Sequence, residues 1–185
     1  NTVPASTKII DLSHDFRLKD QNHDFIYGLP ELNREIIKSS SKVANPRCFA
    51  TCIQLGLLPV AAGGLINGEI NVSGITGSTG AGQSLSPTSH FSWRNNNLSV
   101  YKAFTHQHLG EIGECLQQLA GTDHLINFIP YRGDFTRGII ITSYFDFEAS
   151  EEEAANIYQA YYQDHPFTIV TEINPNLKQV VNTNK

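Results

Sequence analysis

Apolar positions recur at helical spacing in several segments of this chain, and turn or capping residues mark their ends. The longest apolar segment follows an Asn-Pro turn and is closed by Gly63 and Gly64, as is common at a helix C-terminus. Another segment begins after Ser150, which forms a capping-box pattern with Glu153. Helices are therefore predicted over residues 30–37, about 49–62, about 108–120 and about 151–162.

Shorter segments rich in β-branched and aromatic residues predict strands, and the clearest of them is the run over residues 138–147. The other strands are expected over residues 8–12, 69–76, 126–131, 167–172 and 178–181. Strands and helices that alternate in this way indicate an α/β (α+β) fold, in which helices pack on a mixed sheet.

Composition narrows the class of protein further. A chain of 185 residues that is 40% hydrophobic can bury one core, or one domain with an attached lobe. The net charge of −5 and the scattering of the 13 Lys and Arg residues argue against a nucleic-acid surface. No apolar stretch approaches the ~20 residues of a membrane span. The three cysteines, an odd number, indicate free thiols in a reducing compartment such as the cytoplasm.

Cys48 stands where the longest predicted helix begins, directly after Asn45-Pro46-Arg47. The unpaired N–H groups and the dipole of a helix N-terminus favour a thiolate, and Arg47 adds a positive charge. A cysteine in a helix is nevertheless more often a small buried hydrophobic residue than a nucleophile. A catalytic role for Cys48 therefore needs a second signal.

His106 and His108 supply that signal about 60 positions later. A histidine beside a thiol can take and return a proton during covalent catalysis. Glu111 falls on the first turn of the helix that follows, where it could cap the helix or orient a histidine. The alternatives are a metal site or two surface imidazoles, but a metal site is disfavoured because Cys48 and Cys52 have C-x3-C spacing.

The glycine-rich segment over residues 77–82 and two arginines are weaker candidates. Closely spaced glycines let backbone N–H groups converge on an anion, although such a loop is more often only a connection between elements. Arg17 and Arg137 are surface charges by default, but a planar guanidinium suits a carboxylate or phosphate. The polar stretch 92–97 favours a surface turn over a substrate loop.

Taken in chain order, these motifs resemble the N-acetyl-gamma-glutamyl-phosphate reductases, the NADPH-dependent enzymes of arginine biosynthesis. The similarity runs the whole length, and the ordered set is specific although each motif alone is weak. The matching segments are residues 10–18, 27–32, 45–51, 77–82, 106–112, 136–139 and 182–184.

The resemblance implies a domain similar to the C-terminal catalytic domain of glyceraldehyde-3-phosphate dehydrogenase-like enzymes. Cys48 would attack an acyl phosphate to give a thioester, which hydride from NADPH reduces to a semialdehyde. His108 would be the acid and base, with His106, Glu111 and Asn45 in support. The resemblance also implies a small-molecule substrate and a homo-oligomer, a dimer or tetramer, and it implies no metal. The expected substrate-binding residues are Ser13, Arg17 and Arg137, and the expected cofactor-binding residues are Gly80, Ala81 and Gly82.

This chain departs from the family pattern in two ways. The residue before the cysteine is usually glycine, and here it is Arg47, so the turn has ordinary negative φ, or Arg47 is strained, or its side chain faces the substrate. The second departure is that no glycine-rich phosphate loop joins a strand to a helix near the start. We therefore expect an excised piece without the main NADPH-binding loop: residues 1–44 as the tail of an NADP-binding Rossmann domain, and residues 45–185 as the catalytic and dimerisation domain.

Three rival hypotheses stay open. Cys48 and His108 could serve a cysteine hydrolase, or the domain could be a dimerisation module without catalytic activity. Aspartate-semialdehyde dehydrogenase shares the thioester chemistry and the Asn-x-x-Cys placement, but the Asp-Leu-Ser-x-Asp-Phe-Arg and His-x-His-x-x-Glu-Ile motifs fit the arginine-pathway enzyme better. The sequence does not distinguish an acetyl from a succinyl group on the substrate.

Overall fold

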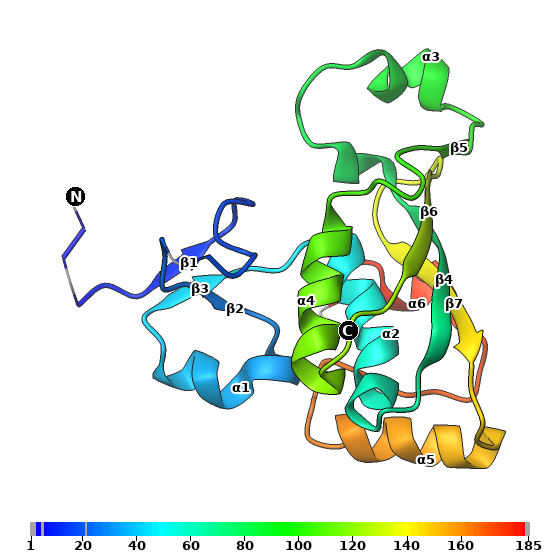
Figure 1. Ribbon diagram of the computed structural model, residues 1–185. Coiled ribbons are helices and arrows are strands. Elements are labelled where there is room, and N and C mark those ends of the chain that lie inside the picture. The colour runs from blue at the N-terminus through cyan, green and yellow to red at the C-terminus, as the bar shows by residue number, and fades with distance from the viewer. Residues whose placement is uncertain (1–2, 5, 21, 184–185) are drawn as a thin grey trace.

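The computed structural model describes residues 3–4, 6–20 and 22–183, which form two β-sheets with helices packed around them (Figure 1). The smaller sheet is parallel, with the order β1-β3-β2. The larger sheet is mixed, with the order β5-β6-β4-β7, and β4 runs parallel to β6 and antiparallel to β7. The strands are β1 (Ile9–Asp11), β2 (Ile26–Tyr27), β3 (Lys42–Ala44), β4 (Asn67–Thr76), β5 (Ser99–Val100), β6 (Ile126–Arg132) and β7 (Ile139–Asp146).

Two long helices, α2 and α4, lie side by side on one face of the larger sheet (Figure 1). Helix α5 crosses below them, and a segment that carries α3 projects from the opposite end. The helices are α1 (Pro30–Ser39), α2 (Cys48–Ala62), α3 (Phe91–Arg94), α4 (His108–Ala120), α5 (Glu151–Tyr162) and α6 (Leu177–Val180), with 3-10 turns η1 (Ser78–Ala81) and η2 (Pro87–Ser89).

The hydrophobic core lies between helix α2 and the larger sheet, and it fixes the first turn of that helix. Phe49, the second residue of α2, is 1% exposed and its ring contacts Phe128 of β6 at 5.1 Å between centroids. A Cβ atom at Gly74 of β4 would meet Phe49 Cε1 at 2.7 Å, so only glycine lets the ring lie this close to the sheet. The start of α2 is therefore anchored by apolar packing.

Most of the elements predicted from the sequence are confirmed, including the capping box at Ser150 and the four longer helices. Strands β2 and β3 are too short for their pattern to reveal them. Two predicted strands are wrong: residues 167–172 form no strand, and residues 178–180 lie in helix α6, which begins because the Asn176 side chain accepts a hydrogen bond from the Lys178 N–H. The 92–97 turn includes part of helix α3. Asn184, in the last matched motif, lies outside the described residues.

Across the described part of the chain, no helix is both long and apolar enough to cross a membrane.

Candidate active site

Cys48 is the first residue of α2 and its side chain is exposed. Arg47 precedes it with φ −87° and ψ 157°, extended backbone that any residue adopts, so arginine stands here without strain. The other two thiols are less accessible: burial raises the pKa of Cys52 to about 11 and that of Cys115 to about 12. Cys48 is thus the thiol best placed to react.

A cavity of about 370 Å³ opens in front of Cys48. Its wall is built from the first turn of α2, the end of β4 at Thr76, the η1 turn, residues 101–108 and the end of β6 at Arg132. Thr76 and Arg132 are register partners on the parallel strands β4 and β6. The cavity therefore lies at the carboxyl edge of two parallel strands, a common position for ligands in α/β proteins.

Both predicted histidines line this cavity, and both are almost fully buried, at 4% exposure for His106 and 2% for His108. His106 Nδ1 accepts a hydrogen bond from the His108 backbone N–H at 3.3 Å, and the two rings meet edge to face at 4.4 Å between centroids. Neither ring nitrogen of His108 has a hydrogen-bond partner among the described residues. A buried imidazole with two open nitrogens is suited to a ligand or a proton transfer.

The electrostatic surroundings keep both imidazoles neutral at pH 7. Burial lowers the pKa of His106 to about 4, with further lowering by Lys102, Arg132 and Arg47. Burial also lowers the pKa of His108 to about 3, with His106 and Arg47 as the next causes. A neutral imidazole can accept a proton, so His108 has the state that a general base requires.

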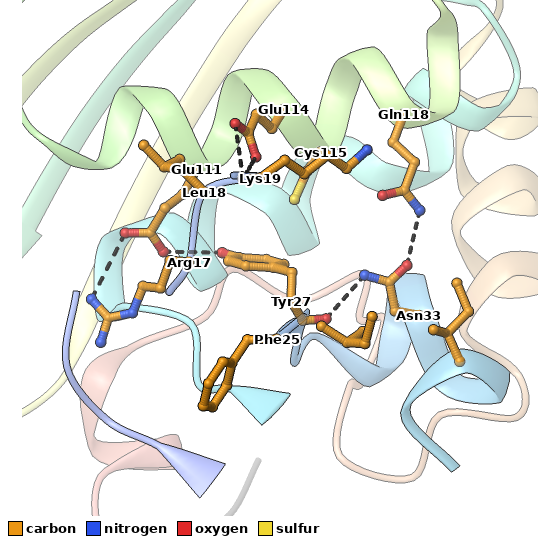
Figure 2. A pocket seen from close by; sticks show the side chains of 12 residues that line it. Arg17, Leu18, Lys19, Phe25, Tyr27, Asn33, Glu111, Glu114, Cys115 and Gln118 are labelled. Carbon is orange, nitrogen blue, oxygen red and sulfur yellow. Dashed lines mark hydrogen bonds and ion pairs between the residues drawn. The ribbon is translucent and has the colours of Figure 1, made fainter. Parts of the chain in front are cut away.

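Glu111 has partners other than those expected from its sequence position. It does not cap its own helix α4, and its carboxylate is not among the hydrogen-bond partners of His108. Its Oε2 instead accepts from the Tyr27 hydroxyl at 3.1 Å (Figure 2). The same oxygen accepts from the Arg47 backbone N–H at 3.3 Å. Because Arg47 is the N-cap residue of α2, Glu111 holds the start of the helix that carries Cys48.

Tyr27 and Gln54 complete a polar cluster around Glu111 that sequence reasoning missed. The Tyr27 hydroxyl lies 3.0 Å from Gln54 Oε1, and Gln54 Nε2 donates to the Glu111 carbonyl and to Cys115 Sγ, each at 3.0 Å. Gln54 is fully buried. We call Arg17, Tyr27, Gln54, Glu111 and Cys115 the Glu111 cluster. The polar Gln54 within an otherwise apolar helix was the one signal in the sequence.

Arg17 is a buried member of this cluster rather than a surface residue. It donates from Nε to the Asn45 carbonyl at 2.7 Å and from Nη2 to the Leu12 carbonyl at 2.8 Å. Its Nη1 lies 4.0 Å from Glu111 Oε1, an ion pair without a hydrogen bond. Arg17 does not line the Cys48 cavity; it lines an adjacent hollow together with Arg47.

Ser13 and Asn45 also lie outside the Cys48 cavity. The Ser13 hydroxyl donates to Asp11 Oδ1 at 2.6 Å and accepts from the Asp15 N–H, which closes a local turn. The Asn45 side chain donates to the Pro46 carbonyl at 3.1 Å, and the Asn45 backbone carbonyl accepts the hydrogen bond from Arg17 Nε. Asn45 thus shapes the chain that leads into α2, whereas Ser13 shapes the turn after β1.

The glycine-rich segment reaches the cavity only in part. Gly80 and Ala81 line it, whereas Gly82 borders a different hollow with the segment that carries α3. A Cβ atom at Gly77 would meet the Thr136 carbonyl oxygen at 2.6 Å, so this glycine allows two backbones to pack. Neighbouring Arg137 is exposed and is not part of the cavity wall.

Sequence reasoning also missed Lys102, Tyr101 and Arg132 on the cavity wall. For Arg132 a signal was present, because a cation that ends a strand parallel to β4 must lie beside the end of β4. For the metal hypothesis, the described residues contain no group of three or more His, Cys, Asp or Glu side chains that could hold a metal ion.

The fold and the cavity together define a mixed α/β domain that presents a cysteine at a helix N-terminus to a cationic cavity with two histidines. A family model described as the semialdehyde dehydrogenase dimerisation domain matches residues 48–185. The chain belongs to this family.

Two sequence relatives carry the same name. Proteins called N-acetyl-gamma-glutamyl-phosphate reductase are 58% identical in Parabacteroides distasonis and 55% identical in Flavobacterium johnsoniae. Each comparison covers the whole chain and 58% of the relative, so the chain spans 58% of the length of these curated relatives. The resemblance carried by the ordered motifs is thereby confirmed.

Solved structures show the same fold at low identity. Aspartate semialdehyde dehydrogenase II from Vibrio cholerae has a TM-score of 0.65 and 15% identity, over 94% of this chain and 58% of that one. Aspartate semialdehyde dehydrogenase from Francisella tularensis has a TM-score of 0.62 and 15% identity, over 95% of this chain and 60% of that one. These likenesses confirm the predicted α/β class.

Proposed function

We propose that the full-length protein is an NADPH-dependent reductase that converts an N-acyl-gamma-glutamyl phosphate to the N-acyl-glutamate semialdehyde in arginine biosynthesis. One observation carries the proposal: an exposed Cys48 lines the same cavity as His108, a buried imidazole whose two ring nitrogens have no hydrogen-bond partner among the described residues. The name of the sequence relatives supports this substrate class.

In the first step the Cys48 sulfur attacks the acyl carbon, the carbon–oxygen bond to phosphate breaks, and a thioester remains. Neutral His108 accepts the thiol proton as the sulfur becomes nucleophilic. The incoming acyl phosphate is an anion, and it would offset the cations that lower the histidine pKa, so the imidazolium is stabilised when substrate is bound. Backbone N–H groups at the start of α2 would stabilise the oxyanion.

In the second step the thioester is reduced to the semialdehyde, and Cys48 leaves as a thiol after His108 returns its proton. The nicotinamide of NADPH supplies the hydride. Gly80 and Ala81 are the residues of this chain that could meet the nicotinamide, because they line the cavity and present no side chain beyond a methyl group.

We place residues 1–44 in the nucleotide-binding domain and residues 45–185 in the catalytic and dimerisation domain. Two observations support this division: the smaller parallel sheet is separate from the larger one, and the family match begins at Cys48. The three free cysteines agree with a reducing compartment such as the cytoplasm.

We also propose that the outer face of the larger sheet binds a second copy of the chain. Helices α2 and α4 cover one face, whereas the side chains on the other face include exposed Ile140 and Tyr144 and half-buried Ile75, Ile129 and Tyr131. The family description, a dimerisation domain, indicates the occupant. Tyr144→Asp should lower the mass measured by light scattering from that of the oligomer, and an unchanged mass would place the interface elsewhere.

The test of the activity is phosphate-dependent reduction of NADP by the full-length protein with N-acetylglutamate semialdehyde. The N-succinyl analogue and aspartate semialdehyde are assayed beside it to identify the acyl group and the substrate class. Cys48→Ser should abolish turnover, whereas Cys52→Ser, one helical turn away and outside the cavity wall, should retain it. Ester hydrolysis without nucleotide, and no turnover of any semialdehyde, would instead favour a cysteine hydrolase.

A further inference from the structure

The wall of the Cys48 cavity is strongly cationic. It contains Arg47, Lys102 and Arg132, and no Asp or Glu among the described residues that form it. All three cations contribute to the lowered pKa of His106, so their charges converge on the reacting end of the cavity. Such a concentration of positive charge favours an anionic ligand.

Arg132 differs from the other two cations because an aromatic ring and a hydrogen-bonded main chain hold it in place. Its guanidinium lies over the Tyr101 ring, with 4.5 Å from Cζ to the ring centroid. Its backbone carbonyl accepts a hydrogen bond from Arg94 Nη1 at 2.8 Å, and Arg94 Nη2 donates to the Thr88 carbonyl at 2.9 Å. Arg94 is only 6% exposed, so a buried side chain holds the backbone at Arg132 and Thr88.

Arg132 also has an open donor. Its Nε is buried and has no hydrogen-bond partner among the described residues. The Lys102 ammonium, in contrast, already donates to Gln107 Oε1 at 2.9 Å. A stacked guanidinium serving only as packing would leave this buried N–H unsatisfied, which destabilises the fold.

We propose that Arg132 binds an oxyanion of the substrate, a phosphate or carboxylate group, inside the Cys48 cavity. The assignment rests on the proposed function and deepens it. Tyr101 orients the guanidinium by stacking, and Arg94 fixes the main chain on which Arg132 stands. The planar fork then presents Nε and a terminal nitrogen to two oxygens of one group, a geometry that lysine does not offer.

The first test needs no enzymatic turnover. Cys48 of the full-length protein is alkylated with iodoacetate, which is anionic, and with neutral iodoacetamide, and the modified peptide is quantified by mass spectrometry. Arg132→Gln should lower the ratio of the iodoacetate to the iodoacetamide rate by about 5-fold or more. Inorganic phosphate should protect Cys48 of the wild type and not of this variant.

Two variants serve as controls for charge and fold. Lys38→Gln removes one positive charge from an exposed site on α1 and should leave the ratio unchanged. Arg132→Lys keeps the charge and should retain most of the ratio, while it loses protection by phosphate because the planar fork is gone. If Arg132→Gln does not fold, Arg132→Lys decides the matter through the protection measurement.

Steady-state kinetics in the oxidative direction then identify the oxyanion. A rise of about 10-fold or more in KM for phosphate alone assigns Arg132 to the phosphoryl group, and the same rise in KM for the semialdehyde alone assigns it to a substrate carboxylate. An alkylation ratio and phosphate protection equal to those of the wild type in both Arg132 variants would overturn the proposal. If the wild type turns over no semialdehyde, the proposed reaction fails, while the alkylation result still decides the anion site.

Discussion

His108 and Glu111 stand three residues apart on helix α4, and both are almost fully buried, yet their surroundings differ completely. His108 faces the Cys48 cavity with two unpartnered ring nitrogens. The Glu111 carboxylate accepts from Tyr27 and from the Arg47 backbone, and its carbonyl accepts from Gln54. One helix turn thus carries a buried group left open for a ligand and a buried group satisfied by the protein.

The difference separates a site from its scaffold. A buried polar group without a partner destabilises the fold, so it persists where a ligand or a proton completes it. A cluster of hydrogen-bonded side chains specifies one arrangement of the elements that contribute to it. The Glu111 cluster joins β2 of the smaller sheet to α2 and α4, which fixes where the N-terminus of α2 presents Cys48. Figure 2 shows the part of this cluster around Tyr27 and Glu111.

The largest expected effect comes from changing His108, the buried residue that faces the Cys48 cavity. His108→Asn should lower kcat of the full-length protein by about 10²–10⁴-fold, because the proposed general base is lost. The free energy of unfolding should change little, since one buried polar side chain without a hydrogen-bond partner among the described residues is replaced by another. Urea unfolding and initial rates measure the two quantities. A variant that is destabilised but active would show that His108 belongs to the scaffold.

Acid should destabilise the protein through the buried histidines of the Cys48 cavity. The pKa is lowered to about 3 for His108 and to about 4 for His106, whereas an unfolded histidine titrates near 6.5. The unfolded chain therefore binds more protons between those values, so the free energy of unfolding falls as pH falls through 6.5 toward 3.

His108→Asn tests the origin of this acid sensitivity. From pH 7 to pH 4 the wild type should lose about 3 kcal/mol more than the variant. Burial raises the pKa of Glu111, which acts in the opposite direction, but Glu111 is present in both proteins and cancels in the difference. Equal losses in urea titrations of the two proteins would place the acid-labile group elsewhere.

Within the Glu111 cluster, Gln54→Ala should lower the free energy of unfolding by about 2–4 kcal/mol. The side chain is fully buried, and its removal leaves a small cavity and breaks its hydrogen bonds to Tyr27, Glu111 and Cys115. Thermal and urea unfolding measure the loss. Because Gln54 lies outside the Cys48 cavity, kcat of the remaining folded enzyme should fall far less than in His108→Asn.

The sequence predicted the residues of the Cys48 cavity better than those of the Glu111 cluster, for a physical reason. Cys48 and His108 belong to local patterns, a helix start and a His-x-His motif, which are visible in one segment. The Glu111 cluster unites residues 27, 54 and 111, and nothing in the local pattern of any one of them reveals the other two.

The same reasoning explains the errors in secondary structure. Residues 42–44 and 26–27 form strands only because they pair with each other and with residues 9–11. Residues 178–181 end in two β-branched valines, which favour a strand, but the cap supplied by Asn176 starts helix α6 there. Arg132 could have been recognised from the sheet order and not from its own neighbours, because its position beside Thr76 depends on the pairing of β6 with β4.

The smallest effect is the sharpest test of the contrast. Tyr27→Phe removes only the hydroxyl that lies between Gln54 Oε1 and Glu111 Oε2, and it leaves the ring in place. The loss of unfolding free energy should be about 1–2 kcal/mol, since two buried acceptors share one donor and Glu111 keeps its bond from the Arg47 N–H.

In a double-mutant cycle of Tyr27→Phe with Gln54→Ala, the combined loss should be smaller than the sum, because both variants remove the same hydrogen bond. Strict additivity would mean that the hydroxyl bonds only to Glu111. A fall in kcat as large as that in His108→Asn would mean that the cluster takes part in the chemistry, and the division into site and scaffold would then be wrong.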